Sequence, residues 1–438
     1  MIYNMRNIIL SLLALLLFQF SNAQSINKQN ATQVSFQQVN KDIFESSYYS
    51  YGSLFLEKQL QKHQNDTSKN LRNFLNTLKD KGVAFGVAES LEGYYNFMGG
   101  RRIGSAAAST FDANITVDMD QLLHITGGKF YADLEAHSFQ NPTNLLVGDL
   151  QVFDKNTANP FLQMFELWYQ QKFFHNTLRL KVGKVDANVE FSLIDNGLDF
   201  MTSSAHVTPT LFVFPTFPDP MPSVNLFFTP GKLFYTSIAV YDANQNDHFL
   251  DFSGKPGSVQ SSLTGTLWIS ETGLTWSHLS GSEDDGNLRL GIWKHTGQFN
   301  RTDDNSLIHG ADGLYIVINQ TLWKPIPEKN TNRGLRMFLE FANSNKGVAP
   351  IYQHFGGGLV WKGITAKRPN DEIGLCTQYG RISPRSGLLW NHEQAVESFY
   401  KIYLTSWLNL QPDAQYIVHP GGKYPNALIG TLQLNLMF

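Results

Sequence analysis

From residue 83 onward, apolar and polar residues alternate one by one in many short stretches. In Phe111 to Asp118 every second residue is apolar and every other residue is polar. The same alternation returns in 178–182, 288–292, 335–341 and 432–438. Side chains on a β-strand point to opposite faces in turn, so this period of two predicts strands with one face in an apolar medium and the other in water.

About 16 such segments follow one another, and an even number is typical of a single-chain bacterial outer-membrane barrel. Strands are expected near 83–97, 109–120, 127–139, 162–173, 176–186, 221–229, 232–242, 269–279, 286–297, 311–322, 333–343, 353–364, 371–380, 396–408, 410–418 and 427–438. A soluble β-sandwich also shows alternating strands. The choice between the two folds therefore depends on the connections.

The connections expected between these strands alternate in length. Those after even-numbered strands are mostly short, the tightest being 174–175, 230–231 and Asn409, whereas the longest, 187–220 and 243–268, follow odd-numbered strands. Short periplasmic turns and long external loops are typical of outer-membrane barrels. The sequence thus predicts an all-β fold, a membrane-spanning antiparallel β-barrel of about 16 strands.

Aromatic residues fall near the ends of several expected strands. They are Tyr95, Phe97, Phe165, Tyr169, Phe234, Trp361, Tyr379 and Tyr416. Such residues are expected to form lipid-facing girdles at the two membrane interfaces. The ordinary preference of aromatic residues for strands explains any single one of them equally well.

The amino terminus has the pattern of a secretory signal. Arg6 precedes an apolar stretch, 8–20, and small residues follow at 21–23. The stretch is shorter than the roughly 20 residues of a spanning helix, so we predict a signal peptide over 1–23 rather than a signal anchor. Residues 24–82 are expected to form a periplasmic segment, and 83–438 the barrel.

The periplasmic segment is predicted to contain one short amphipathic helix. Its apolar residues Leu71, Phe74, Leu75 and Leu78 have helical spacing within 67–81. A docking helix and a merely solvated leader both fit this pattern.

Composition agrees with a wall that faces lipid. Aromatic residues make up 13% of the chain and charged residues only 16%, below the roughly 25% of ordinary soluble domains. The negative mean hydropathy, −0.23, does not argue against a membrane protein, because lipid-facing and lumen-facing residues cancel in such an average. The net charge of −3 gives no reason to expect a nucleic-acid partner.

No pattern in the sequence predicts an enzyme, a cofactor or a metal site. The chain has no G-x-S-x-G, H-E-x-x-H or P-loop string. The pair His392–Glu393 lacks the second histidine that a zinc motif requires. Cys376 is the single cysteine, which excludes an intramolecular disulfide. A barrel enzyme remains the less favoured alternative.

Several blocks, taken in their order and spacing, resemble carbohydrate-selective porins of the OprB type. They are LLVGDLQVFD (145–154), FELWYQQKF (165–173), LRLKVGKVDANVEF (178–191), FFTPGKLFYTSIAVYDAN (227–244), 397–422 and ALIGTLQLNLMF (427–438). The resemblance extends from about residue 99 to 438. It implies a 16-stranded barrel in the outer membrane of a Gram-negative bacterium that conducts sugars passively, with external loops folded inward to form an eyelet.

A sugar-selective lumen requires hydrogen-bonding groups and aromatic faces, and alternation turns both inward. The candidate pore-lining residues are Asp133, Glu135, Glu166, Trp168, Arg179, Lys181, Arg289, Trp293, Arg336 and Lys401. Glu166, Trp168, Arg179 and Lys181, on adjacent strands beside the longest loop, are predicted to form the constriction. Alternatively, these residues simply face water, as in any general diffusion porin, and Trp168 packs against an inward-folded loop.

The loop 187–220 is rich in phenylalanine and stiffened by four prolines. Such a loop is expected to pack inside the barrel as the eyelet, although a surface site for a partner protein is the alternative. The carboxyl-terminal Phe438, which closes an amphipathic strand, resembles the signal read by the barrel-assembly machinery. The expected partners are small sugars, outer-membrane lipid and that machinery, and the porin is expected to be a monomer or a homotrimer.

Overall fold

A computed structural model describes most of the predicted barrel. The described residues are 73–74, 76–243, 250, 252, 264–276, 286–324, 333–385 and 387–437. The predicted signal peptide, most of the predicted periplasmic segment and Phe438 lie outside them. Residues 73–74 and 76–80 are helical, which corresponds to one end of the expected helix. The helix as a whole and the domain boundaries stay predictions.

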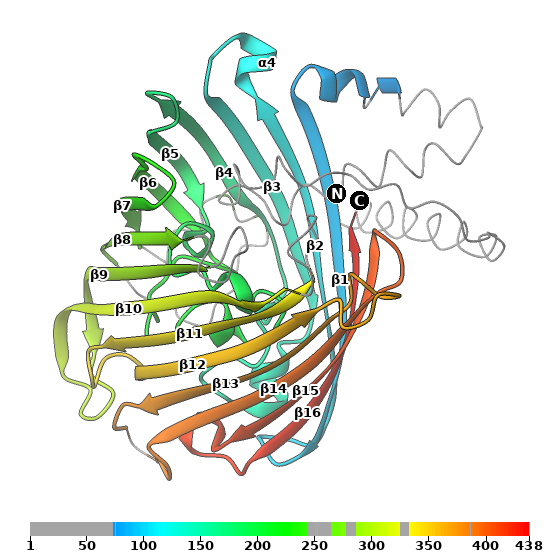
Figure 1. Ribbon diagram of the computed structural model, residues 1–438. Coiled ribbons are helices and arrows are strands. Elements are labelled where there is room, and N and C mark those ends of the chain that lie inside the picture. The colour runs from blue at the N-terminus through cyan, green and yellow to red at the C-terminus, as the bar shows by residue number, and fades with distance from the viewer. Residues whose placement is uncertain are drawn as a thin grey trace. The chain divides into compact units, whose positions relative to one another are not determined.

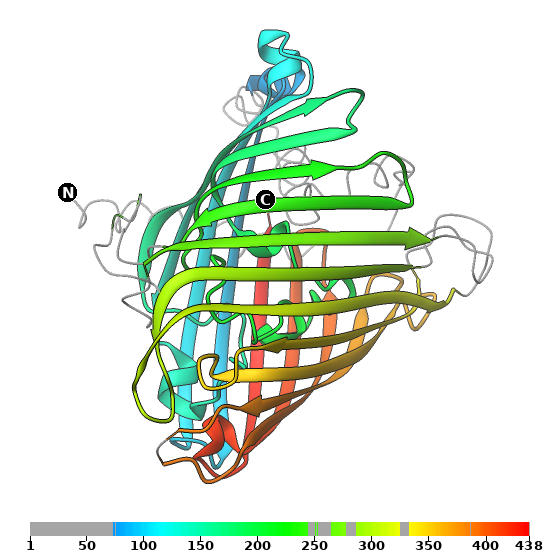
Figure 2. The same cartoon turned by 90° about the vertical axis from the view of Figure 1, so that its left-hand side faces the viewer.

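Sixteen antiparallel strands close into a single barrel, because β1 pairs with β16 as well as with β2. The strands curve around a common interior (Figures 1 and 2). Their bounds are β1 Val83–Met98, β2 Gly104–Asp118, β3 Gly128–Phe139, β4 Phe161–Phe173, β5 Leu178–Val185, β6 Met221–Phe228, β7 Phe234–Asp242, β8 Thr266–Trp276, β9 Gly286–Asn300, β10 Leu307–Trp323, β11 Gly334–Ser344, β12 Ile351–Lys362, β13 Glu372–Ile382, β14 His392–Tyr403, β15 Leu408–Val418 and β16 Ala427–Met437. The predicted fold and strand number are confirmed.

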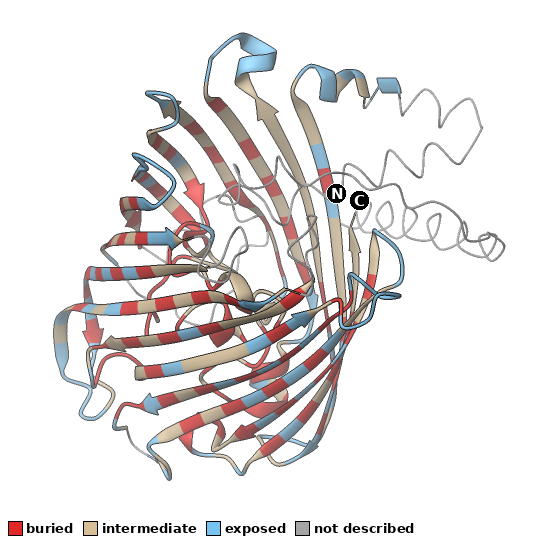
Figure 3. Ribbon diagram, viewed as in Figure 1, coloured by how far each residue is buried: buried red, intermediate tan, exposed pale blue. Residues whose placement is uncertain are grey.

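Burial along the strands is the reverse of that in a soluble protein. On β9 the outward-facing Leu290 and Ile292 are 45% and 65% exposed, whereas the inward-facing Arg289 is 2% exposed. Buried and exposed residues form alternating bands along many strands (Figure 3). Apolar side chains left exposed over such a wall are stable only against lipid.

The connections include a few short helical turns. They are α4 Met119–Leu123, the π-helix η2 Thr143–Val147 and the 3-10 turns η3 Ala187–Val189, η4 Asp195–Gly197, η5 Ser203–Ala205 and η6 Pro420–Gly422. Among the described residues, no helix is long and apolar enough to cross a membrane.

Connection length follows strand parity only for the longest loops. The three longest connections, 140–160, 186–220 and 243–265, all follow odd-numbered strands, as expected. In the second half, however, 363–371 follows an even-numbered strand and is longer than 301–306. Strand parity therefore predicts the positions of the three longest loops but not the lengths of the shorter connections.

Two local predictions are wrong. Asn409 is not a turn, because it lies in β15 and pairs with Tyr403, and the connection is 404–407. Phe165 is not lipid-facing: the register between β3 and β4 shifts here, and a β-bulge turns its side chain inward. The Phe165 ring lies 6.1 Å from that of Phe217 in the β5–β6 loop. The strand end near Asn409 and the bulge at Phe165 both depart from the simple alternation from which the two predictions came.

Candidate functional site: two loops inside the barrel

The β5–β6 loop, 186–220, folds into the barrel and is attached to its inner wall strand after strand. Near its start, Glu190 bonds to two inward-facing bases of β5. Arg179 Nη2 lies 2.7 Å from Glu190 Oε2, and Lys181 forms a second ion pair with the same carboxylate. Burial alone would raise the pKa of Glu190, but the two neighbouring cations outweigh it and hold that pKa below its ordinary value.

The middle of this loop is attached to β8, β9 and β10. The backbone N–H of Ser192 donates to Glu271 at 2.8 Å. Arg289 Nη2 lies 2.8 Å from Asp195 Oδ2, and Asn319 Nδ2 donates to the same oxygen at 3.3 Å. These bonds carry the loop across the interior, away from the strand where it begins.

The part of the loop around Asp199, which lies across the interior from β5, is held by β14 and β15. We call this part the far end of the loop. Lys401 Nζ lies 2.6 Å from Asp199 Oδ1, and Gln411 donates to the Asp199 carbonyl at 2.7 Å. The Glu397 carboxylate accepts the N–H groups of Met201 and Thr202. Although burial would raise the pKa of Asp199, the ammonium group of Lys401 lowers it far below its ordinary range. The loop thus reaches from β5 to β15.

Aromatic side chains fill the space between the loop and the wall. The Phe200 ring packs edge-on against Phe399 at 4.9 Å and against Phe338 at 5.8 Å. The Phe191 ring lies 5.6 Å from Phe227. The predicted inward packing of this phenylalanine-rich loop is therefore present in the structure.

A second loop, 140–160 between β3 and β4, also folds inward, which sequence reasoning missed. Glu393 of β14 accepts the N–H of Leu150 at 2.9 Å and that of Gln151 at 2.8 Å. The two loops meet directly, because Lys155 N donates to Met201 O at 2.7 Å. The Asn and Asp residues of this second loop are typical of an external loop, but Leu146, Val147 and Phe153, which are buried, were a signal that could have indicated inward packing.

All ten predicted pore-lining residues face the interior, but most are covered. Glu166, Trp168, Arg179 and Lys181 do come together: Lys181 Nζ lies 4.0 Å from the Trp168 ring centroid. They are 2%, 7%, 9% and 4% exposed. Glu166 also accepts the N–H of Asp186 at 2.9 Å. The loop lies over this group, so its role in sugar passage stays a prediction.

The other six predicted residues include both buried and partly exposed side chains. Asp133, Glu135, Arg289 and Trp293 are buried, at 1%, 5%, 2% and 3% exposure, whereas Arg336 and Lys401 are partly exposed. Solvent thus reaches the far end of the loop more readily than its start.

A short row of alternating charges lies at this far end. Lys362 of β12 is directly opposite Glu372 of β13, and Glu372 is opposite Lys401 of β14. Lys362 Nζ and Glu372 Oε1 are 2.6 Å apart. We call Asp199, Lys362, Glu372 and Lys401 the far-end cluster. Of these four, Lys401 was among the predicted pore-lining residues, but a single sequence did not show that Asp199 would reach it.

Comparison with known proteins agrees with this architecture. Porin B of Pseudomonas aeruginosa is 22% identical over 409 residues, which cover 82% of this chain and 88% of that protein. The high-pH structure of Pseudomonas putida OprB superposes with a TM-score of 0.72 at 19% identity and covers 84% of this chain and 97% of that one. Its low-pH structure gives 0.55 at 18% identity, with 86% and 98% covered.

The family comparison is the decisive one. The model of the carbohydrate-selective porin, OprB family, matches residues 103–438, which is most of the chain and nearly all of the barrel. Its members are passive channels of the Gram-negative outer membrane and not enzymes. With a closed barrel of 16 antiparallel strands, the chain belongs to the OprB family of carbohydrate-selective porins.

Proposed function

We propose that this porin lets mono- and small oligosaccharides diffuse passively through the barrel, and that the two inward loops form its constriction. The observation that carries the proposal is the attachment of loop 186–220 from β5 to β15. A loop fixed at both sides of the interior narrows the path for every solute. Its exposed groups are then those that a passing sugar meets.

The far-end cluster supplies the polar contacts of this path. The Asp199 and Lys401 side chains are 27% and 16% exposed, and Lys362 is 18% exposed. Carboxylates accept and ammonium groups donate hydrogen bonds, so together they replace water around sugar hydroxyls. Because both signs are present in adjacent pairs, the path admits neutral solutes and has no strong preference for cations or for anions.

The buried group at β4 and β5 has a positioning role in this proposal. Arg179 and Lys181 hold Glu190, and Glu166 holds the backbone at Asp186. These contacts fix the start of the loop and thereby the position of its far end. Trp168 packs beneath the loop, where its ring also stacks with Tyr131 at 5.0 Å.

Ion current through the purified protein in planar bilayers tests the function. Saturating mono- or disaccharide should block the current with a defined concentration dependence, and Lys401→Gln should weaken the block. Leu290→Ile, on the lipid face, should leave it unchanged. If every sugar lowers the current only as its viscosity requires, the protein is a general diffusion porin. Full block in Lys401→Gln would place the sugar contacts away from the far-end cluster.

Assembly belongs to the same proposal. We infer that the barrel-assembly machinery recognises β16 together with Phe438, which follows it in the sequence, and that the porin works as a monomer or a homotrimer in outer-membrane lipid. Deleting Phe438 should reduce insertion more than a change at lumen-facing Gln433, measured as the heat-modifiable fraction on gels. Equal effects would contradict recognition through Phe438. Native mass spectrometry distinguishes the two oligomeric states.

A further inference from the structure

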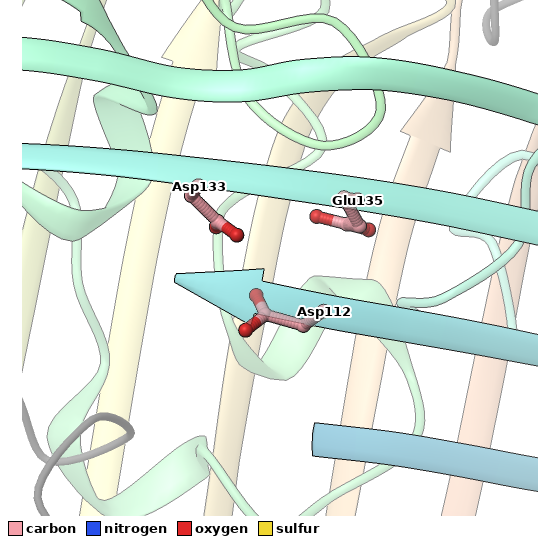
Figure 4. Close-up of side chains that lie close together, drawn as sticks. All are labelled: Asp112, Asp133 and Glu135. Atoms are coloured by element: carbon pink, nitrogen blue, oxygen red, sulfur yellow. The ribbon is translucent and has the colours of Figure 1, made fainter. Parts of the chain in front are cut away.

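Three acidic side chains converge on the inner wall at β2 and β3, away from the far-end cluster. Asp112 lies on β2, and Asp133 and Glu135 lie on β3. One carboxylate oxygen from each lies within 4.8 Å of the others. Figure 4 shows the three carboxylates directed toward one space between the two strands.

The strand register forces these acids together. Asp112 is directly opposite Glu135, and Asp133 is directly opposite Glu166 of β4. Like charges in directly opposed positions destabilise a sheet. Because the strands are fixed by their backbone pairing, the carboxylates cannot separate by sliding apart.

Asp133 gives an independent indication that a ligand is needed here. Asp133 is 1% exposed, and neither carboxylate oxygen has a hydrogen-bond partner outside this group of three acids. It points into the space between Asp112 and Glu135 (Figure 4). A buried carboxylate without a partner is costly, and a bound ion is one of the few ways to satisfy it.

We propose that Asp112, Asp133 and Glu135 bind one calcium ion. Carboxylate oxygens are the ligands that Ca²⁺ and Mg²⁺ prefer, with metal–oxygen distances of about 2.3–2.6 Å for Ca²⁺ and about 2.0–2.1 Å for Mg²⁺. Oxygens up to 4.8 Å apart can face each other across the larger ion with little movement. Asp112 is only partly buried, so water completes the coordination and the ion enters from the lumen.

Calcium at this position would support the start of the inward loop. It removes the repulsion between Asp133 and Glu166, which face each other across β3 and β4. Glu166 then remains a charged acceptor for the N–H of Asp186, where the loop leaves β5. The ion therefore joins β2 to β3 and favours the attached form of the loop.

Calorimetric titration of the chelator-treated porin in detergent with CaCl₂, and separately with MgCl₂, tests the proposal. Wild type should bind about one Ca²⁺ per chain, and more tightly than Mg²⁺. Asp133→Asn should weaken Ca²⁺ binding by about tenfold or more, because ligand charge sets the affinity of such sites. Asp312→Asn, which removes an exposed acid elsewhere on the wall, should bind Ca²⁺ as wild type does.

Thermal unfolding tests the same site, because the difference in melting temperature between variant and wild type should change sign when Ca²⁺ is added. In chelator, Asp133→Asn should melt at a higher temperature than wild type, because one repelling charge is gone. With Ca²⁺ the order should reverse, because only wild type gains stability from the ion. If the variant does not fold, as judged by heat modifiability, Glu135→Gln takes its place in both measurements.

Three results would overturn the calcium site. They are the absence of saturable Ca²⁺ binding by wild type at millimolar concentration, an unchanged affinity in the folded cluster variant, and a variant that melts above wild type with and without Ca²⁺. Tighter binding of Mg²⁺ than of Ca²⁺ would contradict the choice of ion.

Discussion

The start of loop 186–220, at Glu190, and the part farthest from β5, at Asp199, use the same chemistry in different surroundings. At β5, the Glu190 side chain is 1% exposed and bonds to Arg179 and Lys181, whose side chains are 11% and 5% exposed. At β14, Asp199 and Lys401 form a similar pair but are 27% and 16% exposed. A buried pair cannot meet a solute, whereas a partly exposed pair can. This difference in exposure supports the proposal that the first pair positions the loop and the second contacts the solute.

The largest effect is expected from Glu190→Gln. The change leaves two buried cations without their carboxylate, and removing one partner of a buried ion pair destabilises a protein by about 3–5 kcal/mol. The start of the loop should detach, so single-channel conductance should rise and become noisier. A quiet current of wild-type size, together with an unchanged free energy of unfolding in detergent, would show that Glu190 does not hold the loop.

The next effect concerns pH, because Asp186 at the start of the loop is also buried. Burial raises its pKa to about 6, although hydrogen bonds such as that from Asn188 N oppose the shift. In the unfolded chain this pKa is about 3.9. The folded barrel therefore holds the proton more tightly, and the free energy of unfolding should fall by about 2–3 kcal/mol as pH rises from about 4 to about 6.

Asp186→Asn isolates this contribution. The variant should lose the fall between about pH 4 and 6, measured by urea unfolding at a series of pH values. Glu190, whose pKa is lowered, acts in the opposite direction: its stabilisation is lost as pH falls through its folded pKa, below its ordinary value. Subtracting the free energy of unfolding of the variant from that of wild type at each pH removes the contribution of Glu190. Parallel pH curves would mean that Asp186 is not buried in solution.

Substitutions in the far-end cluster should change selectivity more than stability. Lys401→Gln removes a positive charge from the path and should shift the reversal potential toward cations, whereas Asp199→Asn should shift it toward anions. Each should reduce stability by only about 1–2 kcal/mol, as expected for a partly exposed charged hydrogen bond. Shifts of the same sign in both variants would contradict the proposal that these side chains line the path.

The smallest effect is expected at the exposed connection between β9 and β10. Arg301 and Asp303 form an ion pair at 2.6 Å, but both side chains are about one-third exposed. Exposed pairs contribute little, because water competes for both partners. Asp303→Asn should change neither the unfolding curve nor the reversal potential. A clear shift in either would indicate that the outer rim, and not burial, determines the difference between the two loop ends.

The sequence predicted the wall well because the membrane imposes a simple rule on it. Leu290 and Ile292 must face lipid, so Arg289 must face inward, and this alternation alone located all 16 strands to within a few residues. Inward orientation was also predictable for the buried group at β5. Its burial was expected only as the alternative in which Trp168 of β4 packs against an inward-folded loop, because the path of that loop depends on distant strands.

Long-range contacts explain what the sequence did not predict. The bulge at Phe165 adds one residue to β4, and no local pattern indicates it. Glu393 reaches Leu150 across the interior from a position more than two hundred residues later in the chain. Such contacts depend on barrel closure, which brings β14 to the loop that follows β3 and cannot be deduced from either segment alone.

Several wall acids hold the loops by their main chain. Glu393 accepts N–H groups of Leu150 and Gln151, and Glu397 accepts those of Met201 and Thr202. Every residue except proline offers an N–H, whatever its side chain. Side chains at these loop positions can therefore mutate while the attachment persists. A lineage could alter the solutes that it admits by small steps in the loops, without rebuilding the barrel at each step.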